Sequence, residues 1–110
     1  MEHFFRKIQG WFGYEQLYSD MVKKFPTNSH FVEVGSWKGR STSFLAVEII
    51  NSGKNIQLDC IDTWRGSLDE KVHQNDSSVI NDTLYDEFLK NIEPVKNIIK
   101  PIRYESNKFK

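Results

Sequence analysis

Residues 31–42 read FVEVGSWKGRST, a short apolar segment followed by a glycine-bearing turn and the start of a helix. Gly35 permits a backbone conformation that a side chain would forbid, and Gly39 permits close packing of the helix on the strand. The first N–H groups of a helix have no partner within the helix, and they favour an anionic group. The stretch therefore predicts a strand, turn and helix of an α/β protein, with a turn suited to a carboxylate or a phosphate.

Hydrophobic periodicity on both sides of this stretch predicts alternating helices and strands. Apolar residues over 14–25 recur at the spacing of an amphipathic helix, which Pro26 ends. Gly53 suits the left-handed cap of the next helix, and Asp82 can cap a third helix that Pro94 ends. The predicted elements are helices over 14–25, over 39–51 and from Asp82 to Pro94, and strands over 30–34, 56–62 and 98–104, with a polar connection over 63–80.

The order of these elements indicates how the strands associate. Helices that alternate with strands build a parallel sheet, here in the spatial order three-two-one. Pro101 cannot donate a hydrogen bond to a neighbouring strand, so the third strand belongs at a sheet edge, as this order requires. The chain stops where another helix ought to begin, and the first strand would keep an unpaired edge. We therefore expect an α/β fold, a three-layer Rossmann-like parallel sheet of which residues 1–110 form the N-terminal half, preceded by an amphipathic helix.

Composition excludes several classes of protein. The chain has 15 basic and 15 acidic residues, so no net charge attracts a nucleic acid or an anionic membrane. No stretch approaches the roughly 20 apolar residues of a membrane span, and the first residues lack the apolar region of a signal peptide. The single cysteine, Cys60, lies in an apolar run and is expected to be a small buried hydrophobe rather than a nucleophile. We expect a cytoplasmic protein that binds neither nucleic acid nor membrane.

The turn departs from the glycine pattern of dinucleotide-binding proteins. In that pattern, G-x-G-x-x-G, the middle glycine lets a pyrophosphate approach the backbone. Trp37 occupies the middle position here, and an indole would obstruct the pyrophosphate. S-adenosylmethionine has no phosphate, and its amino-acid end suits both the N–H groups of the turn and the carboxylate of Glu33. The turn therefore favours a sulfonium cofactor over a nicotinamide dinucleotide, although any α/β protein can contain a glycine-bearing turn.

A second motif, CIDTWRG over residues 60–66, follows the second predicted strand. Asp62 lies 23 positions beyond Gly39, close to the spacing at which an acidic residue accepts hydrogen bonds from ribose hydroxyls. An aspartate at a strand end is also a common solvated residue or helix cap. Trp64 could cover an adenine or the mouth of a pocket, or it could pack over the core.

The polar connection after this motif does not predict a metal site. His73 has no visible partner there and is expected to be a solvated loop histidine rather than a catalytic base. The carboxylates Asp69, Glu70 and Asp76 share the segment, but their spacing fits no dedicated metal site.

Together these motifs resemble the class I S-adenosylmethionine-dependent methyltransferases, in which a glycine turn and an Asp-x-Trp-x-Gly motif occur together. The resemblance covers GWF at 10–12, the stretch at 31–42, IDTWRGS at 61–67 and PIRYES at 101–106. It implies a seven-stranded Rossmann-like fold, with the methionine end of the cofactor at the turn, the ribose at Asp62, and Trp64 and Ser106 near the adenine. The predicted cofactor-binding residues are Glu33, Gly35, Ser36, Trp37, Gly39, Ser41, Asp62, Thr63, Trp64 and Ser106.

The resemblance implies methyl transfer to a small-molecule or glycan acceptor. In such enzymes the fourth strand and its loop supply residues near the acceptor, so we expect this single, apparently truncated, cofactor-binding half to lack the catalytic residues. Two alternatives remain open from the sequence. One is a fragment of a nicotinamide-dependent oxidoreductase, and the other is a non-catalytic assembly module that forms oligomers through the exposed sheet edge.

Overall fold

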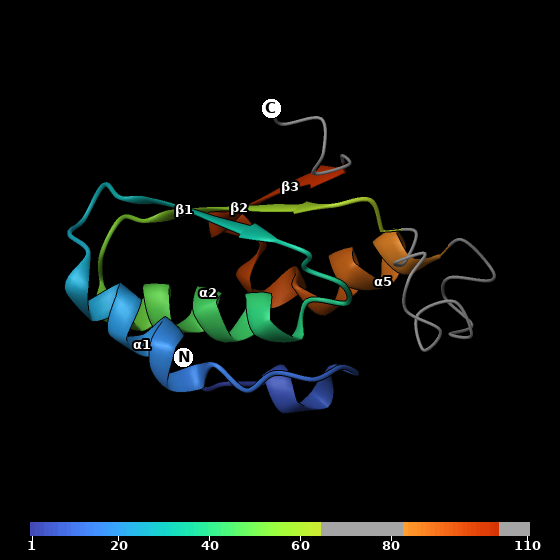
Figure 1. Cartoon of the computed structure of the whole chain (residues 1–110), viewed down its shortest axis with the longest axis horizontal. Coiled ribbons are helices and arrows are strands. Elements are labelled where there is room, and N and C mark those ends of the chain that lie inside the picture. The colour runs from blue at the N-terminus through green and yellow to red at the C-terminus, as the bar shows by residue number, and fades with distance from the viewer. Residues whose placement is uncertain (65–82, 104–110) are drawn as a thin grey trace.

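Three parallel strands form one sheet in the computed structural model, which describes residues 1–64 and 83–103 (Figure 1). The strands are β1 (His30–Val34), β2 (Gln57–Asp62) and β3 (Ile99–Arg103). β2 lies in the middle, so the predicted parallel order is confirmed. In the register, Val34 is paired with Ile61 and Asp62 with Arg103, which brings the carboxyl ends of all three strands to the same edge.

The helices of the described residues lie on one face of this sheet (Figure 1). Side chains from the helices and from the inner face of the strands share one core, which includes Val22, Ala46, Leu58 and Phe88. The helical elements are η1 (Phe5–Lys7), α1 (Glu15–Lys24), α2 (Arg40–Ser52), α5 (Leu84–Asn91) and η2 (Glu93–Ile98). None of these described helices is long and apolar enough to cross a membrane.

The opposite face of the sheet is open at β1. The exposed fractions of Val32 and Val34 are 57% and 61%, and residues of β1 alternate between exposed and buried. Such alternation is typical of a strand with one covered face. Within residues 1–64 and 83–103 no helix covers the open face, so the α/β sheet is established while the second helical layer of the predicted fold stays a prediction.

Most predicted element boundaries agree with the structure within one or two residues. Gly53 caps the C-terminus of α2 in the left-handed conformation with a φ of 72°, as predicted. The prediction for the third helix needs two corrections. Thr83 rather than Asp82, which lies outside the described residues, is the N-cap of α5. Pro94 follows the end of α5 and also lies in the first turn of η2. Proline suits that position because the first N–H groups of a helix have no partner within the helix, and proline has no N–H.

Residues 1–13, here called the N-terminal strap, run along the outer side of α2, and the sequence predicted no structure for them. Phe5 and Phe12 pack with Phe44 of α2 in a second, smaller aromatic cluster. Figure 1 shows the strap beneath α2, on the side away from the sheet. α2 is therefore covered on both sides, which explains why most of its residues are buried.

Candidate functional site

The turn between β1 and α2, residues 35–39, has an unusual backbone. Gly35, Trp37 and Gly39 all adopt left-handed conformations, with φ of 82°, 53° and 93°. The N–H of Gly35 donates to the carbonyl of Ile61 on β2 at 2.8 Å, and the N–H of Gly39 donates to the carbonyl of Ser36 at 2.9 Å. These bonds hold the start of α2 against the carboxyl ends of β1 and β2.

The two glycines of the turn serve different purposes. A Cβ added to Gly35 would meet no atom within 4 Å, so Gly35 borders open space. A Cβ added to Gly39 would lie 3.0 Å from Ile92 Cγ2 and 3.2 Å from Phe88 Cδ1. Gly39 therefore permits close packing as predicted, but its partner is the α5 side of the core rather than the strand. Left-handed backbone strongly favours glycine at both positions.

Glu33 at the end of β1 is buried and accepts hydrogen bonds from four hydroxyl groups. Tyr18 of α1 and Ser41 of α2 each donate to Oε2 at 2.9 Å. Ser36 of the turn donates to Oε1 at 2.9 Å, and Thr42 of α2 donates to the same oxygen. A carboxylate has about four acceptor positions, so these donors occupy all of them. The Glu33 cluster, meaning Glu33 and these four residues, thus joins α1, the turn and α2 to β1.

Burial and the charge of Glu33 favour the neutral forms of Tyr18 and Cys60. Burial, and then the negative charge of Glu33, raise the pKa of Tyr18 well above its usual range. The same two causes, burial first, raise the pKa of Cys60 to about 12. Cys60 has no exposed surface, so the prediction that this cysteine is buried is confirmed, and its raised pKa disfavours the reactive thiolate.

Asp62 at the end of β2 joins the two predicted motifs. Its Oδ2 accepts from the N–H of Trp37 at 2.8 Å, and its Oδ1 accepts from the N–H of Trp64 at 3.0 Å. The indole Nε1 of Trp64 donates to the carbonyl of Trp37 at 2.8 Å. These three residues form a closed hydrogen-bonded ring, here called the Asp62 ring. Asp62 is partly exposed, and each of its oxygens accepts one of these bonds and has a second acceptor position.

Both tryptophans of the Asp62 ring have a φ of 53°, an unfavourable conformation for a bulky residue. Such strain persists only where the surroundings enforce it, and it is concentrated at functional sites. The Trp64 side chain has no exposed surface and contacts Tyr85 and Phe88 with ring centroids 4.7 Å apart. Of the two alternatives for Trp64, the structure shows packing in the core. An adenine could contact this indole only if the Trp64 side chain moved out of the core.

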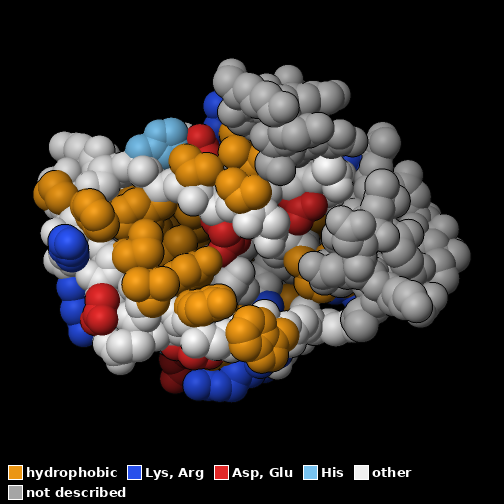
Figure 2. Space-filling model, viewed as in Figure 1, with side chains coloured by type: hydrophobic (Ala, Val, Ile, Leu, Met, Phe, Trp, Pro, Cys, Tyr) orange, Lys and Arg blue, Asp and Glu red, His pale blue; other side chains and the backbone are white. Residues whose placement is uncertain are grey.

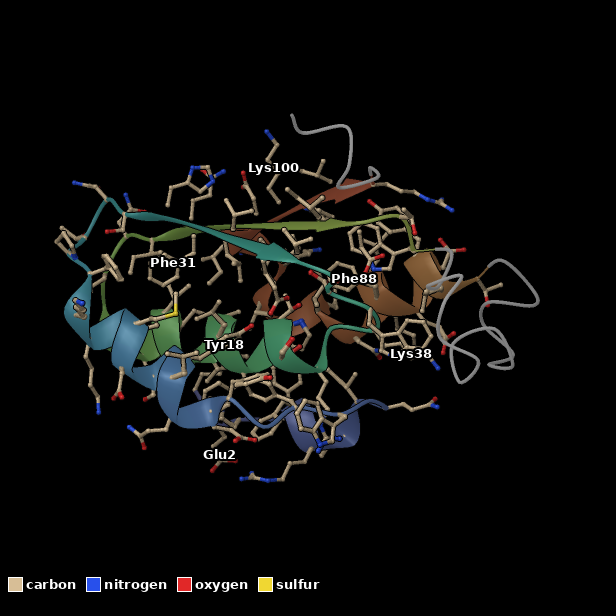
Figure 3. The ribbon with its side chains drawn as sticks, in the orientation of Figure 1. Glu2, Tyr18, Phe31, Lys38, Phe88 and Lys100 are labelled. Atoms are coloured by element: carbon tan, nitrogen blue, oxygen red, sulfur yellow. The ribbon has the colours of Figure 1, made fainter. Side chains whose placement is uncertain are left out.

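Lys38 is a residue of the turn that the sequence did not single out. Its exposed fraction is 2%, and its ammonium Nζ donates to Gln9 Oε1 of the strap at 2.7 Å. Its carbonyl accepts from Asn91 Nδ2 of α5 at 3.0 Å. In Figure 3 Lys38 and Phe88 lie toward the carboxyl end of β1, whereas Phe31 lies near its beginning. The turn is thus held from β2, from α5 and from the strap.

The structure brings nine of the ten predicted site residues together at the carboxyl ends of β1 and β2. Ser106 lies outside the described residues, as do His73, Asp69, Glu70 and Asp76. Among the described residues, no three or more His, Cys, Asp or Glu side chains gather as metal ligands would. Figure 2 shows acidic groups in the middle of the viewed face, set among hydrophobic side chains.

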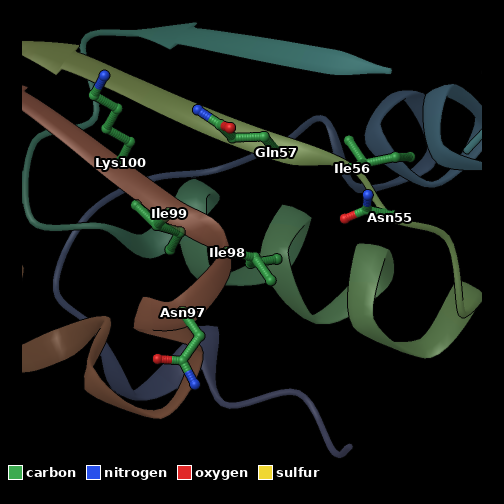
Figure 4. A pocket seen from close by; sticks show the side chains of 7 residues that line it. All are labelled: Asn55, Ile56, Gln57, Asn97, Ile98, Ile99 and Lys100. Carbon is green, nitrogen blue, oxygen red and sulfur yellow. The ribbon is translucent and has the colours of Figure 1, made fainter. Parts of the chain in front are cut away.

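A pocket of about 350 Å³ opens elsewhere, at the beginnings of β2 and β3 (Figure 4). Residues 55–57 and 97–100 line it. Because parallel strands start at the edge opposite to their carboxyl ends, this pocket is separate from the candidate site.

In comparisons with known proteins, no family model matches the chain and no curated protein matches it.

Proposed function

We propose that this chain is the cofactor-binding part of a Rossmann-like, S-adenosylmethionine-dependent methyltransferase. The observation that supports this most directly is the 2.8 Å hydrogen bond from the N–H of Trp37 to Asp62. It joins the glycine turn after β1 to the acidic residue after β2, the two features expected to bind opposite ends of one ligand.

The remaining polar groups suit the two ends of the cofactor. The N-cap of α2 is Gly39, which has no side chain to cap the helix, so the first N–H groups of α2 can receive the methionine carboxylate. The open space beside Gly35 leaves room for this end. Asp62 retains acceptor capacity for the two ribose hydroxyls. Both ends of the ligand would lie along the carboxyl edge of the sheet.

Glu33 has a different role in this proposal from the one the sequence suggested. Because four hydroxyls already occupy its carboxylate, it does not meet the amino group of the cofactor directly. It holds Ser36, which lies in the turn, and Ser41, which follows it at the start of α2, in place instead. Glu33 is therefore a positioning residue.

The bound cofactor would supply a methyl group on a sulfonium sulfur. The acceptor, a small molecule or a glycan, would attack this methyl in line, forming the new bond as the sulfur–methyl bond breaks and S-adenosylhomocysteine leaves. The acceptor loses a proton to water or to a base outside the described residues. Orientation supplies most of the catalysis in such a displacement, and a rigid turn serves that purpose.

A thermal-shift comparison of S-adenosylhomocysteine with NADH tests the proposal. A ligand that binds only the folded state stabilises it, by about 2.7 kcal/mol at a concentration of about 100 times its Kd. We expect a rise in melting temperature with S-adenosylhomocysteine and none with NADH. Gly35→Val, which fills the open space, should abolish the rise. Stabilisation by NADH alone would favour the oxidoreductase instead.

One observation favours a second candidate, an assembly module. β1 is an edge strand that exposes Val32 and Val34 and carries no proline or lysine, whereas the other edge, β3, contains Lys100 and Pro101. Lysine and proline protect edge strands from pairing with other chains. Sedimentation of the chain and of Val34→Lys separates this candidate from the enzyme. The assembly module would be supported if the wild-type chain forms a stable oligomer, does not bind S-adenosylhomocysteine, and becomes monomeric in Val34→Lys.

A further inference from the structure

The N-terminal strap is fastened to α2 at both ends of the helix. At the far end, which is the C-terminal end of α2, the N-terminal ammonium of Met1 donates to Asn51 Oδ1 at 2.7 Å. Asn51 Nδ2 in turn donates to the Met1 carbonyl at 2.9 Å. At the near end, Arg40 Nη1 donates to the carbonyl of Ile8 at 2.9 Å. Arg40 and Asn51 lie on the same side of α2, because eleven residues make about three helical turns.

The near end of the strap also reaches the turn after β1. Gln9 Oε1 accepts the bond from the Lys38 ammonium, and the Lys38 side chain is almost completely buried. Gly10, with a φ of 141°, passes so close to the turn that an added Cβ would lie 3.6 Å from Trp37 Cδ1. Residues 8–10 therefore lie against three of the four positions from 37 to 40, namely Trp37, Lys38 and Arg40.

These contacts restrain a strained backbone. A buried ammonium needs hydrogen-bond acceptors, because burying an unsatisfied charge is strongly unfavourable. Removing the Gln9 acceptor would weaken the hold of the strap on Lys38, whose neighbours in the chain are Trp37 and Gly39. The left-handed conformation of Trp37 would then lose part of the packing that enforces it.

We propose that Ile8, Gln9 and Gly10 are positioning residues of the cofactor site, which hold the turn of residues 35–39 in the conformation that binds the ligand. This inference rests on the proposed function for the identity of the ligand, S-adenosylmethionine or S-adenosylhomocysteine. The restraint of the turn itself does not depend on that identity. None of the three residues has to touch the ligand.

The experiment compares three variants of the full chain. Gln9→Leu removes the acceptor that the strap offers to Lys38, Gln9→Glu keeps one, and Asn51→Ala releases the far end of the strap as a matched control. The first readout is amide hydrogen exchange at Trp37 and Gly39 in the protein without ligand. The second is the Kd for S-adenosylhomocysteine, measured by titration calorimetry. Melting temperature is recorded for each variant to separate positioning from stability.

We expect Gln9→Leu to accelerate exchange in the turn and to raise the Kd, each by about tenfold, the effect of losing one charge-assisted hydrogen bond. Gln9→Glu should restore both values, and Asn51→Ala should change neither, even if it lowers the melting temperature. Equal effects of Gln9→Leu and Asn51→Ala, or none from Gln9→Leu, would overturn the inference. If the wild-type chain does not bind S-adenosylhomocysteine, the proposed function fails, and hydrogen exchange alone still decides whether the strap restrains the turn.

Discussion

Two carboxylates end neighbouring strands of the same sheet, and their surroundings differ. Glu33 has an exposed fraction of 7% and accepts from four hydroxyl groups on α1, the turn and α2. Asp62 is partly exposed and accepts from two backbone N–H groups. A carboxylate whose acceptor positions are all used can only hold the protein together. A carboxylate with unused acceptor positions can stabilise the fold and also bind a ligand. Mutation of Glu33 should therefore affect mainly stability, and mutation of Asp62 mainly ligand binding.

The largest effect should follow removal of the saturated carboxylate. Glu33→Ala leaves four buried or partly buried hydroxyls without their acceptor. Each unsatisfied buried group costs about 1–3 kcal/mol, and some hydroxyls will find other partners, so we expect a loss of about 3–5 kcal/mol in the free energy of unfolding. Urea denaturation measures this loss.

Two further variants make the Glu33 test decisive. If Glu33→Ala does not fold, Glu33→Gln, which keeps one acceptor oxygen, should still unfold cooperatively with a loss of about 2 kcal/mol. Glu93→Ala is the control, because Glu93 forms only an exposed ion pair with Lys96 and should change stability by less than about 1 kcal/mol. Equal losses for Glu33→Gln and Glu93→Ala would contradict the role of the cluster.

Asp62→Asn should weaken ligand binding more than folding. The amide nitrogen can no longer accept from Trp37 or Trp64, and one oxygen has to serve both the ring and the ribose. We expect the Kd for S-adenosylhomocysteine to rise by about 10 to 100-fold, with a stability loss of only about 1–2 kcal/mol. Calorimetric titration and urea denaturation give the two numbers.

Asp59 supplies the matched control for this change. It lies on the same strand, and its Oδ2 is 2.7 Å from Nε2 of His30 on β1. Asp59→Asn removes the same charge from β2, away from the candidate site, and should leave the Kd unchanged. If both variants weaken binding equally, Asp62 has no specific place at the ligand.

The difference between the two carboxylates shows what the sequence could and could not reveal. Asp62 was predicted because its signal is local, an acidic residue directly after an apolar strand at a fixed distance from the glycine turn. The strands, the edge position of Pro101 and the left-handed cap at Gly53 were predicted for the same reason, since each depends on neighbouring residues. Local patterns determine elements and their ends.

The Glu33 cluster and the strap could not be predicted, because they depend on contacts between distant residues. Tyr18 and Glu33 are 15 positions apart, and Gln9 and Lys38 are 29 apart. Thr42 and Gln9 read equally well as solvated residues, and Ser36 and Ser41 were predicted to bind the cofactor rather than to contact Glu33. Trp64 was ambiguous for a related reason, since only its contacts with Tyr85 and Phe88 distinguish a core residue from a ligand-binding one.

Trp64→Phe tests whether the Asp62 ring stabilises the turn. It removes the indole N–H that donates to the carbonyl of Trp37 in a partly buried hydrogen bond. An unsatisfied buried group costs about 1–3 kcal/mol, and because this bond is only partly buried we expect a loss near the lower end of this range, below that of Glu33→Ala. Trp11→Phe is the control, because Trp11 is 78% exposed and its replacement should change stability by less than about 0.5 kcal/mol. Equal stability in the two variants would show that the ring contributes nothing.

The effect that is smallest at neutral pH is a pH dependence of stability, which develops only under alkaline conditions and distinguishes the two carboxylates. The pKa of Cys60 is raised from 9.0 to about 12 in the folded chain, so above about pH 9 the unfolded chain binds fewer protons than the folded one. Stability then falls by up to about 1.4 kcal/mol for each pH unit up to about pH 12, and this contribution is fully present below about pH 9. Urea denaturation at a series of alkaline pH values should show a steeper decline for the wild type than for Cys60→Ala.

The charge of Glu33 is the second cause of the raised pKa of Cys60, after burial, whereas Asp62 is not among its causes. Glu33→Gln should therefore make the alkaline decline shallower, and Asp62→Asn should leave it as in the wild type. Tyr18 also has a pKa raised by burial and by Glu33, so its contribution changes in the same direction in Glu33→Gln and is common to the wild type and Cys60→Ala. A decline that Asp62→Asn flattens as much as Glu33→Gln would mean that the two carboxylates act on one core, and that the division between a structural and a ligand-binding carboxylate is wrong.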